Sequence, residues 1–507
     1  MSRTRNTMRN LFYGAGGQII TLLCNFISRK IFIMTLGSEY LGLSAVFSNL
    51  LSMLSLAELG VGSAIAFALY KPLAEKDTEK IKSIMDLFRK VYWSIGGIIA
   101  FLGICLTPFL GFFTGETSIP MIPVLFLLYV ANSAVSYFYS YKGTLINADQ
   151  QKYIVTINNN VFKVILDFVQ CIILILTHNF LLFLVGQLLV TICSNYVLSR
   201  KAEKMYPYLR EKGAKKLERE SLQSIIKNVS AMVFHKLGNV LVNATDSLII
   251  TKFVNLVAAG LYSNYQMIVN AIQNFEWLIY YSVTASVGNY NVTESDEKKY
   301  ELFQFINFVN YLSTGFCSLG LWVMFQPFIS SFYGENMILS EYAVFLICLR
   351  YFVTGMRKSV LTFRDAMGLY WYDRYKSLFE SGINLGVSIL LATRFGIVGV
   401  LWGTVISTVA TCFWIEPYVL YKYGLKRKLA PYFGSYAVYT LKTLLVALCI
   451  TLSTHFLNVR NNVLQIFVNG VVLVVEFLLL TWLLNLKNPH MNRLFGVGKR
   501  LFNRKKI

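Results

Sequence analysis

Three arginines recur at a constant interval in an otherwise apolar stretch, residues 340–368. Arg350, Arg357 and Arg364 are seven residues apart, and Lys358 follows the middle one. Because seven residues make nearly two turns of an α-helix, the three guanidinium groups are predicted to share one face over roughly 20 Å of helix. Guanidinium groups bind phosphate oxygens through paired hydrogen bonds. The spacing therefore predicts a face that binds a negatively charged group, with structural ion pairs as the alternative.

This stretch is also long enough to cross a membrane, which takes about 20 residues of helix. An arginine at the centre of a bilayer costs at least about 2.5–3.5 kcal/mol. We therefore expect the arginine face to meet a water-filled cavity or an anionic partner rather than lipid tails.

The composition is that of a polytopic membrane protein. Of 507 residues, 55% are hydrophobic and 14% are charged, which predicts an all-α protein rather than a soluble globule. The hydrophobic pattern predicts about fourteen transmembrane helices, near residues 10–34, 41–69, 84–107, 122–144, 155–176, 180–199, 226–251, 257–288, 301–326, 340–368, 377–393, 396–420, 433–454 and 464–485.

The net charge of +21 is explained by topology. Most of the 47 Lys and Arg residues fall in loops and tails on the side of the N-terminus, and the opposite loops hold only Lys252, Arg394 and Arg460. The positive-inside rule then places both termini in the cytoplasm. The basic N-terminal tail has no small-residue cleavage site, so we expect a retained first helix. Nucleic acid is not expected as a partner.

An internal repeat relates the two halves of the chain. A shift of 218 residues aligns Gly42 with Gly260 and Thr144 with Thr362, and the hydropathy matches along both halves. Six spans per half predict parallel repeats that form two lobes. The expected domains are an N-terminal lobe (1–200), a cytoplasmic linker (201–226), a C-terminal lobe (227–421), and two extra helices with a basic tail (422–507).

Polar side chains follow helical spacing in several other predicted spans. Such stripes mark either hydrogen bonds between helices or a water-filled cavity, and together they favour a shared cavity. The residues expected to line it are Arg29, Lys30, Lys142, His235, Lys236, Asn239, Asn243, Asn270, Arg350, Arg357, Lys358 and Arg364.

Three intramembrane carboxylates, Glu58, Asp246 and Glu276, have no obvious cation in their own span. A buried carboxylate without a partner can take up and release a proton, so these residues are candidates for ion coupling. Pairing with Arg or Lys from another span is the alternative. Lys163 and Asp167 are predicted to form a local ion pair, whereas Glu380 and Glu416 are expected to reach water.

The sequence carries no signature of an enzyme or of a cofactor site. It has no nucleotide-binding P-loop, no GxSxG and no HExxH. All eight cysteines lie in predicted spans without a CxxC pair, so we expect packing residues rather than disulfides or metal ligands. We predict a transporter that uses no cofactor or metal and that draws on an ion gradient, the membrane potential or downhill flux.

Residues 36–77, LGSEYLGLSAVFSNLLSMLSLAELGVGSAIAFALYKPLAEKD, resemble the second span of bacterial polysaccharide transporters, as does the layout of twelve plus two spans with a basic central loop. These are the O-antigen and teichoic-acid flippases of the multidrug/oligosaccharidyl-lipid/polysaccharide exporter superfamily. The resemblance implies a two-lobed bundle with alternating access in a bacterial plasma membrane. It also implies a cargo of glycan linked through diphosphate to a polyprenyl lipid, for O-antigen or capsule synthesis. Polysaccharide polymerase or assembly proteins are implied as partners.

The implied function is therefore a lipid-linked oligosaccharide flippase, in which the basic cavity residues hold the diphosphate. A peptidoglycan-precursor flippase would share the anionic lipid cargo and stays open as an alternative. A drug or cation exporter of the same fold would favour an acidic cavity. A membrane glycosyltransferase, polymerase or ligase would need a large outer loop, which the chain does not have.

Overall fold

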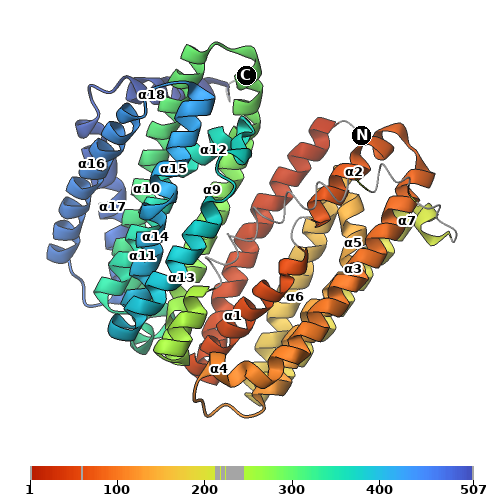
Figure 1. Cartoon of the computed structure of the whole chain (residues 1–507). Coiled ribbons are helices and arrows are strands. Elements are labelled where there is room, and N and C mark those ends of the chain that lie inside the picture. Colours follow the sequence, from red (N-terminus) through yellow and green to blue (C-terminus); the bar gives the residue numbers. More distant parts are fainter. Residues whose placement is uncertain (1–2, 59–60, 212–216, 218–222, 224–244, 505–507) are drawn as a thin grey trace. The chain divides into compact units, whose positions relative to one another are not determined.

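The computed structural model describes residues 3–58, 61–211, 217, 223 and 245–504. Over these residues the regular elements are helices, and nine of the helices are long and apolar enough to cross a membrane (Figure 1). This confirms the predicted all-α class of an integral membrane protein. The chain divides into two compact units, Met1–Ser263 (unit 1) and Asn264–Ile507 (unit 2). The domain division expected at residues 201–226 falls largely outside the described residues and stays a prediction.

Unit 1 is a bundle in which α1 packs against α6, α5 packs against both α3 and α7, and α6 packs against α7. Its elements are α1 (Arg3–Leu54), a 3₁₀ turn (Ser55–Glu58), α2 (Val61–Glu75), α3 (Thr78–Leu106), α4 (Leu110–Thr114), α5 (Ile122–Ala148), α6 (Lys152–Thr177), α7 (Phe180–Met205) and a second 3₁₀ turn (Pro207–Arg210).

The first two predicted spans are joined in α1, which is kinked at Gly37. Gly37 has φ 85° and ψ −178°, a conformation that glycine adopts without steric cost. The kink lets the chain turn where a short outer loop was expected. The second predicted span is itself divided, because α1 ends at Leu54 and α2 begins at Val61.

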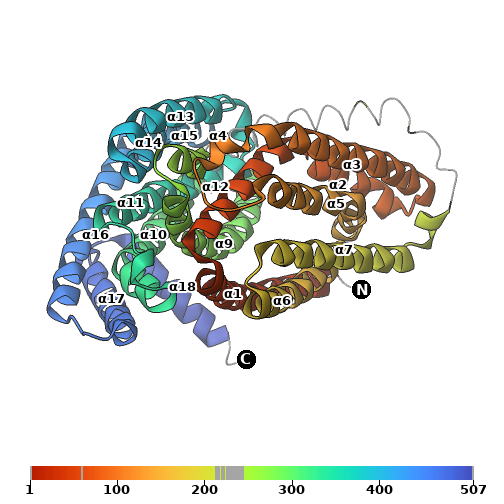
Figure 2. The same ribbon diagram turned by 90° about the horizontal axis from the view of Figure 1, so that it is seen from below.

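Unit 2 holds most of α9 and the remaining helices, with α13 against α14, α10 against α11 and α17, and α16 against α17. Its elements are α9 (Leu256–Thr293), α10 (Asp296–Tyr333), a 3₁₀ turn (Glu335–Met337), α11 (Glu341–Met356), α12 (Lys358–Ala366), a 3₁₀ turn (Leu369–Trp371), α13 (Lys376–Phe395), α14 (Ile397–Ala410), α15 (Cys412–Val419), a π-helical turn (Leu420–Leu425), α16 (Ala430–Phe456), α17 (Asn462–Leu484) and α18 (Pro489–Arg504). Figure 2 gives a second view of these elements.

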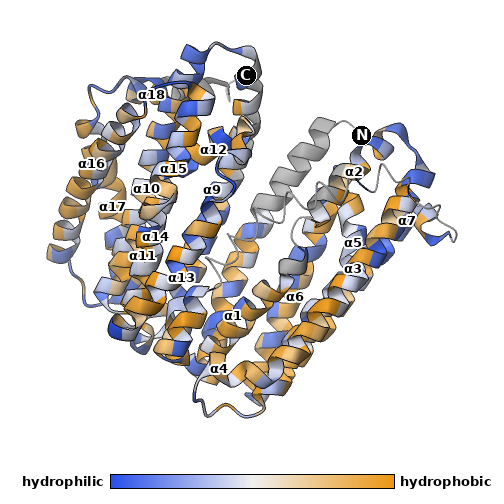
Figure 3. Ribbon diagram, viewed as in Figure 1, coloured by the Kyte–Doolittle hydropathy of each residue, from blue (hydrophilic) through white to orange (hydrophobic). Residues whose placement is uncertain are grey.

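The last two long helices, α16 and α17, are largely hydrophobic along their length (Figure 3). Leu441, Leu448, Val471 and Leu478 are exposed on their surfaces. A face of exposed leucine and valine suits contact with lipid tails and would be costly in water. Between the two helices and α10, a separate apolar core is buried around Val446, which is 1% exposed.

The two glycines that the internal repeat aligns lie at one helix crossing within unit 1. A Cβ atom on Gly42 of α1 would lie 1.9 Å from the carbonyl oxygen of Leu256, at the start of α9. A Cβ atom on Gly260 would lie 2.4 Å from the carbonyl oxygen of Ser38. The backbones of α1 and α9 approach so closely that only glycine fits on both sides.

Candidate functional site

The arginine-bearing stretch forms two helices instead of the single span expected from the sequence. α11 ends at Met356 and α12 begins at Lys358, with Arg357 at the junction. Asn310 of α10 donates hydrogen bonds from Nδ2 to the carbonyl oxygens of Gly355 (3.1 Å) and Met356 (3.0 Å). These carbonyls would otherwise accept bonds from the next helical turn. The junction places Arg350 on α11 and Arg364 on α12.

Arg357 makes a two-point contact with Glu416 of α15. Its Nε lies 2.8 Å from Oε2, and its Nη2 lies 2.7 Å from Oε1. Glu416 is 0% exposed, so the expectation that this carboxylate reaches water is wrong. A second carboxylate, Glu380 of α13, lies 3.8 Å from Nη1 of Arg357. The guanidinium is thus held by two carboxylates of the same unit.

The same carboxylate, Glu416, also accepts a hydrogen bond from Lys376, at the start of α13. Lys376 lies 3.1 Å from Asp373, and Asp373 lies 2.6 Å from Arg364. Arg364 in turn contacts Asp365 at 2.7 Å. The contacts link the groups in a row in which carboxylates and cations alternate.

We call this row the ion chain; its members, in order, are Asp365, Arg364, Asp373, Lys376, Glu416, Arg357 and Glu380. Most of these side chains are buried. Buried charges are tolerated when each is paired and hydrogen-bonded. The geometry thus gives Arg357 and Arg364 structural partners, the alternative that the sequence left open for them.

Glu380 stands at one end of the ion chain and is itself buried, not in water as expected. It accepts a hydrogen bond from the Thr408 hydroxyl at 3.1 Å and from the Cys412 thiol at 3.0 Å. These neutral donors satisfy both of its oxygens. Sequence spacing could not identify the contact, because the residues lie on different helices.

Lys358, the cation next to the middle arginine, pairs with Glu276 of α9. Its Nζ also lies 5.2 Å from the centre of the Tyr351 ring, an arrangement that stabilises a cation away from water. Glu276 is 7% exposed. A cation from another span therefore neutralises this coupling candidate, the pairing that the sequence left open for it.

In unit 1, the coupling candidate Glu58 is held by two tyrosines. The Tyr137 hydroxyl donates to Oε2 at 2.7 Å, and the Tyr92 hydroxyl lies 3.5 Å from Oε1. No ion pair of Glu58 occurs among the described residues, since its contacts are neutral donors. Glu58 thus differs from Glu276, which is paired with a lysine.

Two further lysines of unit 1 have carboxylate partners. Lys142 lies 2.5 Å from Glu203 and 2.8 Å from the Ser199 hydroxyl. The predicted ion pair between Lys163 and Asp167 is confirmed, with 2.7 Å between Nζ and Oδ1. Carboxylates of unit 1 thus neutralise both Lys142 and Lys163.

Three other candidates lie on α1 and α9. Arg29 donates from Nη2 to the hydroxyl of Ser263, Lys30 is exposed, and Asn270 is exposed on α9. Asp246 accepts a hydrogen bond from the Tyr262 hydroxyl at 3.3 Å. The remaining expected cavity residues, His235, Lys236, Asn239 and Asn243, lie outside the described residues.

No protein-family model matches the chain, and no curated protein sequence matches it. Solved structures do match. The lipid II flippase MurJ in an inward closed conformation superposes with a TM-score of 0.65 and 14% identity, over 96% of this chain and 99% of that chain. An inward-facing multidrug resistance MATE family transporter of the MOP superfamily matches with a TM-score of 0.62 and 14% identity, over 80% of this chain and 96% of its own.

A mutant of the Vibrio cholerae MATE transporter VcmN matches with a TM-score of 0.55 and 15% identity, over 83% of this chain and 99% of that chain. Identities this low establish the fold and leave the activity open. The chain therefore has the helical fold that the lipid II flippase MurJ shares with MATE transporters of the MOP superfamily.

Proposed function

We propose that this protein is a flippase that moves polyprenyl-diphosphate-linked oligosaccharide, the repeat unit of a surface polysaccharide, from the inner to the outer leaflet. We place it in a bacterial plasma membrane with both termini in the cytoplasm, as a transporter of the polysaccharide branch of the superfamily rather than an enzyme. Polysaccharide polymerase or assembly proteins are its proposed partners.

The observation that carries the proposal is how much of the chain each neighbour covers. The MATE transporters match 80% and 83% of this chain, whereas the lipid II flippase matches 96%. The difference is about the size of the segment that holds α16, α17 and α18. A layout with two additional lipid-facing helices favours a lipid-linked cargo over a small drug.

The ion pairs of unit 2 limit which residues could hold the diphosphate. Arg357 and Arg364 are bound within the ion chain, so a diphosphate would have to displace a carboxylate to reach them. Such an exchange leaves a buried carboxylate without its cation, which is strongly unfavourable. We therefore do not assign the diphosphate to Arg357 or Arg364. Arg29 and Lys30 of unit 1 and Arg350 of unit 2 stay separate candidates from the sequence.

Flux in proteoliposomes tests the proposal. The full chain is reconstituted with a fluorescent polyprenyl-diphosphate disaccharide, and its accessibility in the opposite leaflet is followed with and without a proton or sodium gradient. We expect saturable flux above that of protein-free liposomes, and much less flux of the monophosphate analogue, because it offers fewer charge-assisted hydrogen bonds.

Two alternatives are decided by the same preparation. The MurJ neighbour raises lipid II as a second cargo, so preference for lipid II over other diphosphate lipids would assign a peptidoglycan-precursor flippase. Transport of ethidium without flux of any diphosphate lipid would assign a drug exporter and refute the proposal.

A further inference from the structure

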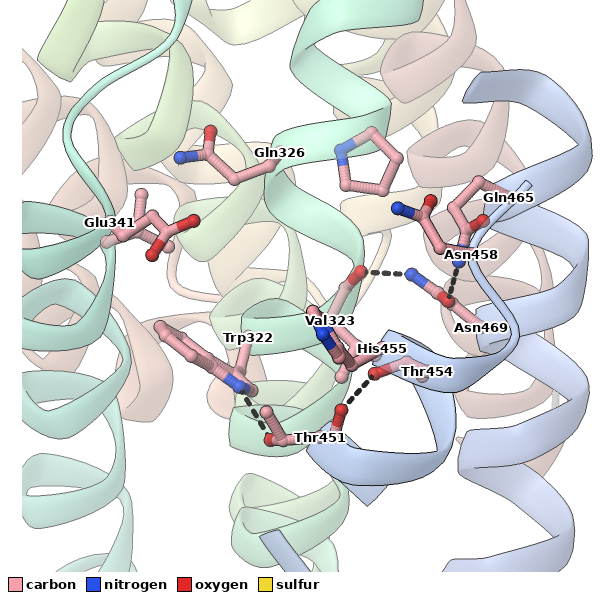
Figure 4. A pocket seen from close by; sticks show the side chains of 12 residues that line it. Trp322, Val323, Gln326, Glu341, Thr451, Thr454, His455, Asn458, Gln465 and Asn469 are labelled. Carbon is pink, nitrogen blue, oxygen red and sulfur yellow. Dashed lines mark hydrogen bonds between the residues drawn. The ribbon is translucent and has the colours of Figure 1, made fainter. Parts of the chain in front are cut away.

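Unit 2 contains a polar pocket of about 340 Å³ between α10, α11, α16 and α17 (Figure 4). It lies at the end of the unit where α10 ends at Tyr333, α11 begins at Glu341 and a short loop joins α16 to α17. The positive-inside orientation predicts that this end faces the outside. Its volume lies within the range of small-molecule sites, about 300–1,000 Å³.

A proline fixes one wall of the pocket. Pro327 lies inside α10 and has no N–H, so the carbonyl of Val323 receives no helical hydrogen bond from it. Asn469 of α17 donates to this carbonyl at 2.6 Å and accepts a hydrogen bond from Gln465 at 2.7 Å. The amides of α17 therefore hold this wall in place.

Hydrogen bonds also hold the side of the pocket that is formed by Trp322 and Gln326. The indole N–H of Trp322 donates to the Thr451 hydroxyl at 3.0 Å. Gln326 donates to the carbonyl of Leu339 at 2.9 Å and accepts from the Tyr265 hydroxyl at 2.9 Å. These bonds fix the orientation of the aromatic ring and of the amide, so the pocket is preorganised.

The mouth of the pocket carries polar side chains that do not take part in the hydrogen bonds that hold the walls. Glu341 and Asn458 approach from opposite sides, with His455 between them (Figure 4). All three side chains are exposed, and no hydrogen bond or ion pair engages them among the described residues. They supply a carboxylate acceptor, a carboxamide and an imidazole.

The charge of the pocket selects against phosphate. Its lining includes the carboxylate of Glu341 and no lysine or arginine, whereas phosphate groups are bound by cations. An indole, several amides and a single carboxylate suit a ring that has an apolar face and hydroxyl groups at its edge, because hydroxyls can both donate and accept hydrogen bonds.

We propose that this pocket binds an uncharged sugar ring, as a mono- or disaccharide. The inference rests on the proposed function for the source of the sugar, which is the glycan of the transported lipid once it reaches the outer side. The diphosphate of that lipid would bind elsewhere, since the pocket provides no cation for it.

Saturation-transfer NMR with the purified full chain in nanodiscs tests the site, because glycosidic detergents would compete for it. The probes are methyl glucoside, methyl N-acetylglucosaminide and a disaccharide of each. We expect saturable binding that Asn458→Ala and Glu341→Ala weaken about tenfold, the effect of losing one or two hydrogen bonds. Glu341→Gln keeps one acceptor oxygen and replaces the other with an NH2 donor, either of which can bond a sugar hydroxyl, so affinity should stay within about threefold of the unaltered protein. Glu335→Gln, in the neighbouring turn and outside the pocket, is the matched control.

Tetraethylammonium and inorganic pyrophosphate serve as charge probes. Binding of tetraethylammonium that Glu341→Gln abolishes would make this a cation site and overturn the inference, as would binding of pyrophosphate at the pocket or the lack of glycoside binding. Glycoside binding without flux of lipid-linked oligosaccharide would refute the proposed function and leave the sugar site standing. Flux of lipid-linked oligosaccharide without glycoside binding would refute the sugar site and leave the proposed function standing.

Discussion

Arg357 binds Glu416 through two hydrogen bonds of 2.8 Å and 2.7 Å, and this carboxylate is fully buried. The middle arginine of a regularly spaced set is therefore satisfied inside its own unit. Because Glu416 also binds Lys376, it joins α15 to the junction of α11 and α12 and to the start of α13. The contact organises the helices of unit 2.

The first prediction concerns the stability of this contact. Arg357→Gln leaves Glu416 with Lys376 as a remaining cation, whereas Glu416→Gln leaves two buried cations without a shared carboxylate. Breaking one partner of a buried pair costs about 3–5 kcal/mol. We expect both variants to unfold at lower temperature than the unaltered protein, with Glu416→Gln the worse, as measured by thermal unfolding in detergent.

The double variant Arg357→Gln/Glu416→Gln provides the control for coupling. Because it removes both charges, its loss of stability should be smaller than the sum of the two single losses. Additive losses, or an unchanged unfolding temperature in Arg357→Gln, would show that the pair does not hold these helices together.

The second prediction concerns the close approach of α1 and α9. Gly42→Ala places a methyl group where it would lie 1.9 Å from the carbonyl oxygen of Leu256, so the helices must move apart. Overpacking of this kind costs about 1–3 kcal/mol, and the unfolding temperature should fall. Gly97→Ala in α3 has nothing within 4 Å of the new atom and should be neutral or slightly stabilising. An equal change of unfolding temperature in the two variants would contradict the close approach of α1 and α9.

The third prediction assigns ion coupling in unit 1 to Glu58. Glu58→Gln can still accept from the Tyr137 hydroxyl through its carbonyl oxygen and donate from its NH2 group to the Tyr92 hydroxyl, so the protein should fold normally, but the amide cannot exchange a proton. We expect transport in proteoliposomes to lose its response to a proton gradient. Glu276→Gln strands its partner Lys358 and should instead lower the amount of folded protein. A full gradient response in folded Glu58→Gln would remove Glu58 from the coupling step.

The fourth prediction is a pH dependence of the C-terminal helix. His490 of α18 packs against the ring of Phe308, with 6.0 Å between ring centres. Burial lowers the pKa of His490 below its ordinary value of 6.5, and the nearby charge of Arg493 lowers it further. The docked helix therefore binds fewer protons than the undocked helix between pH 6.5 and the lowered pKa.

This lowered pKa determines how docking of α18 depends on pH. Docking of α18 is at full strength above pH 6.5 and weakens as the pH falls through 6.5 towards the lowered pKa. Amide hydrogen exchange of residues 489–496, corrected for intrinsic rates, should show less protection at about pH 5.5 than at about pH 7.5. His490→Phe should remove the difference. Equal protection of the unaltered helix at both values would disprove the effect.

The sequence allowed the fold class to be predicted because hydrophobic length reports directly on membrane spans. Where the prediction failed, the cause was local. The stretch around Arg357 was expected to be one helix, but Asn310 binds two of its carbonyls from another helix. Contacts of this kind depend on tertiary structure and leave no periodic signal.

The candidate site was harder to predict for the same reason. Spacing identified Lys163 and Asp167, which are four residues apart on one helix. It did not identify Asp373 and Lys376, which follow a 3₁₀ turn and read as loop residues. A better signal was the presence of carboxylates in or beside the predicted spans, because a buried arginine requires a carboxylate partner from somewhere in the chain.

The last prediction tests whether Arg350 binds the diphosphate or has a structural role. Arg350 precedes the helix break and is not part of the ion chain. If it binds the diphosphate, Arg350→Gln removes a charge-assisted hydrogen bond worth about 1.5–3 kcal/mol, a loss of about ten- to a hundredfold in flux per folded molecule at limiting substrate. Arg350→Lys should recover part of it, because lysine keeps the charge but not the two-point geometry. Arg394→Gln, an exposed arginine at the end of α13, is the matched control and should leave flux unchanged. Protein level is scored separately. Normal flux per molecule in Arg350→Gln, or a loss of folded protein like that expected for Arg357→Gln, would assign Arg350 a structural role as well.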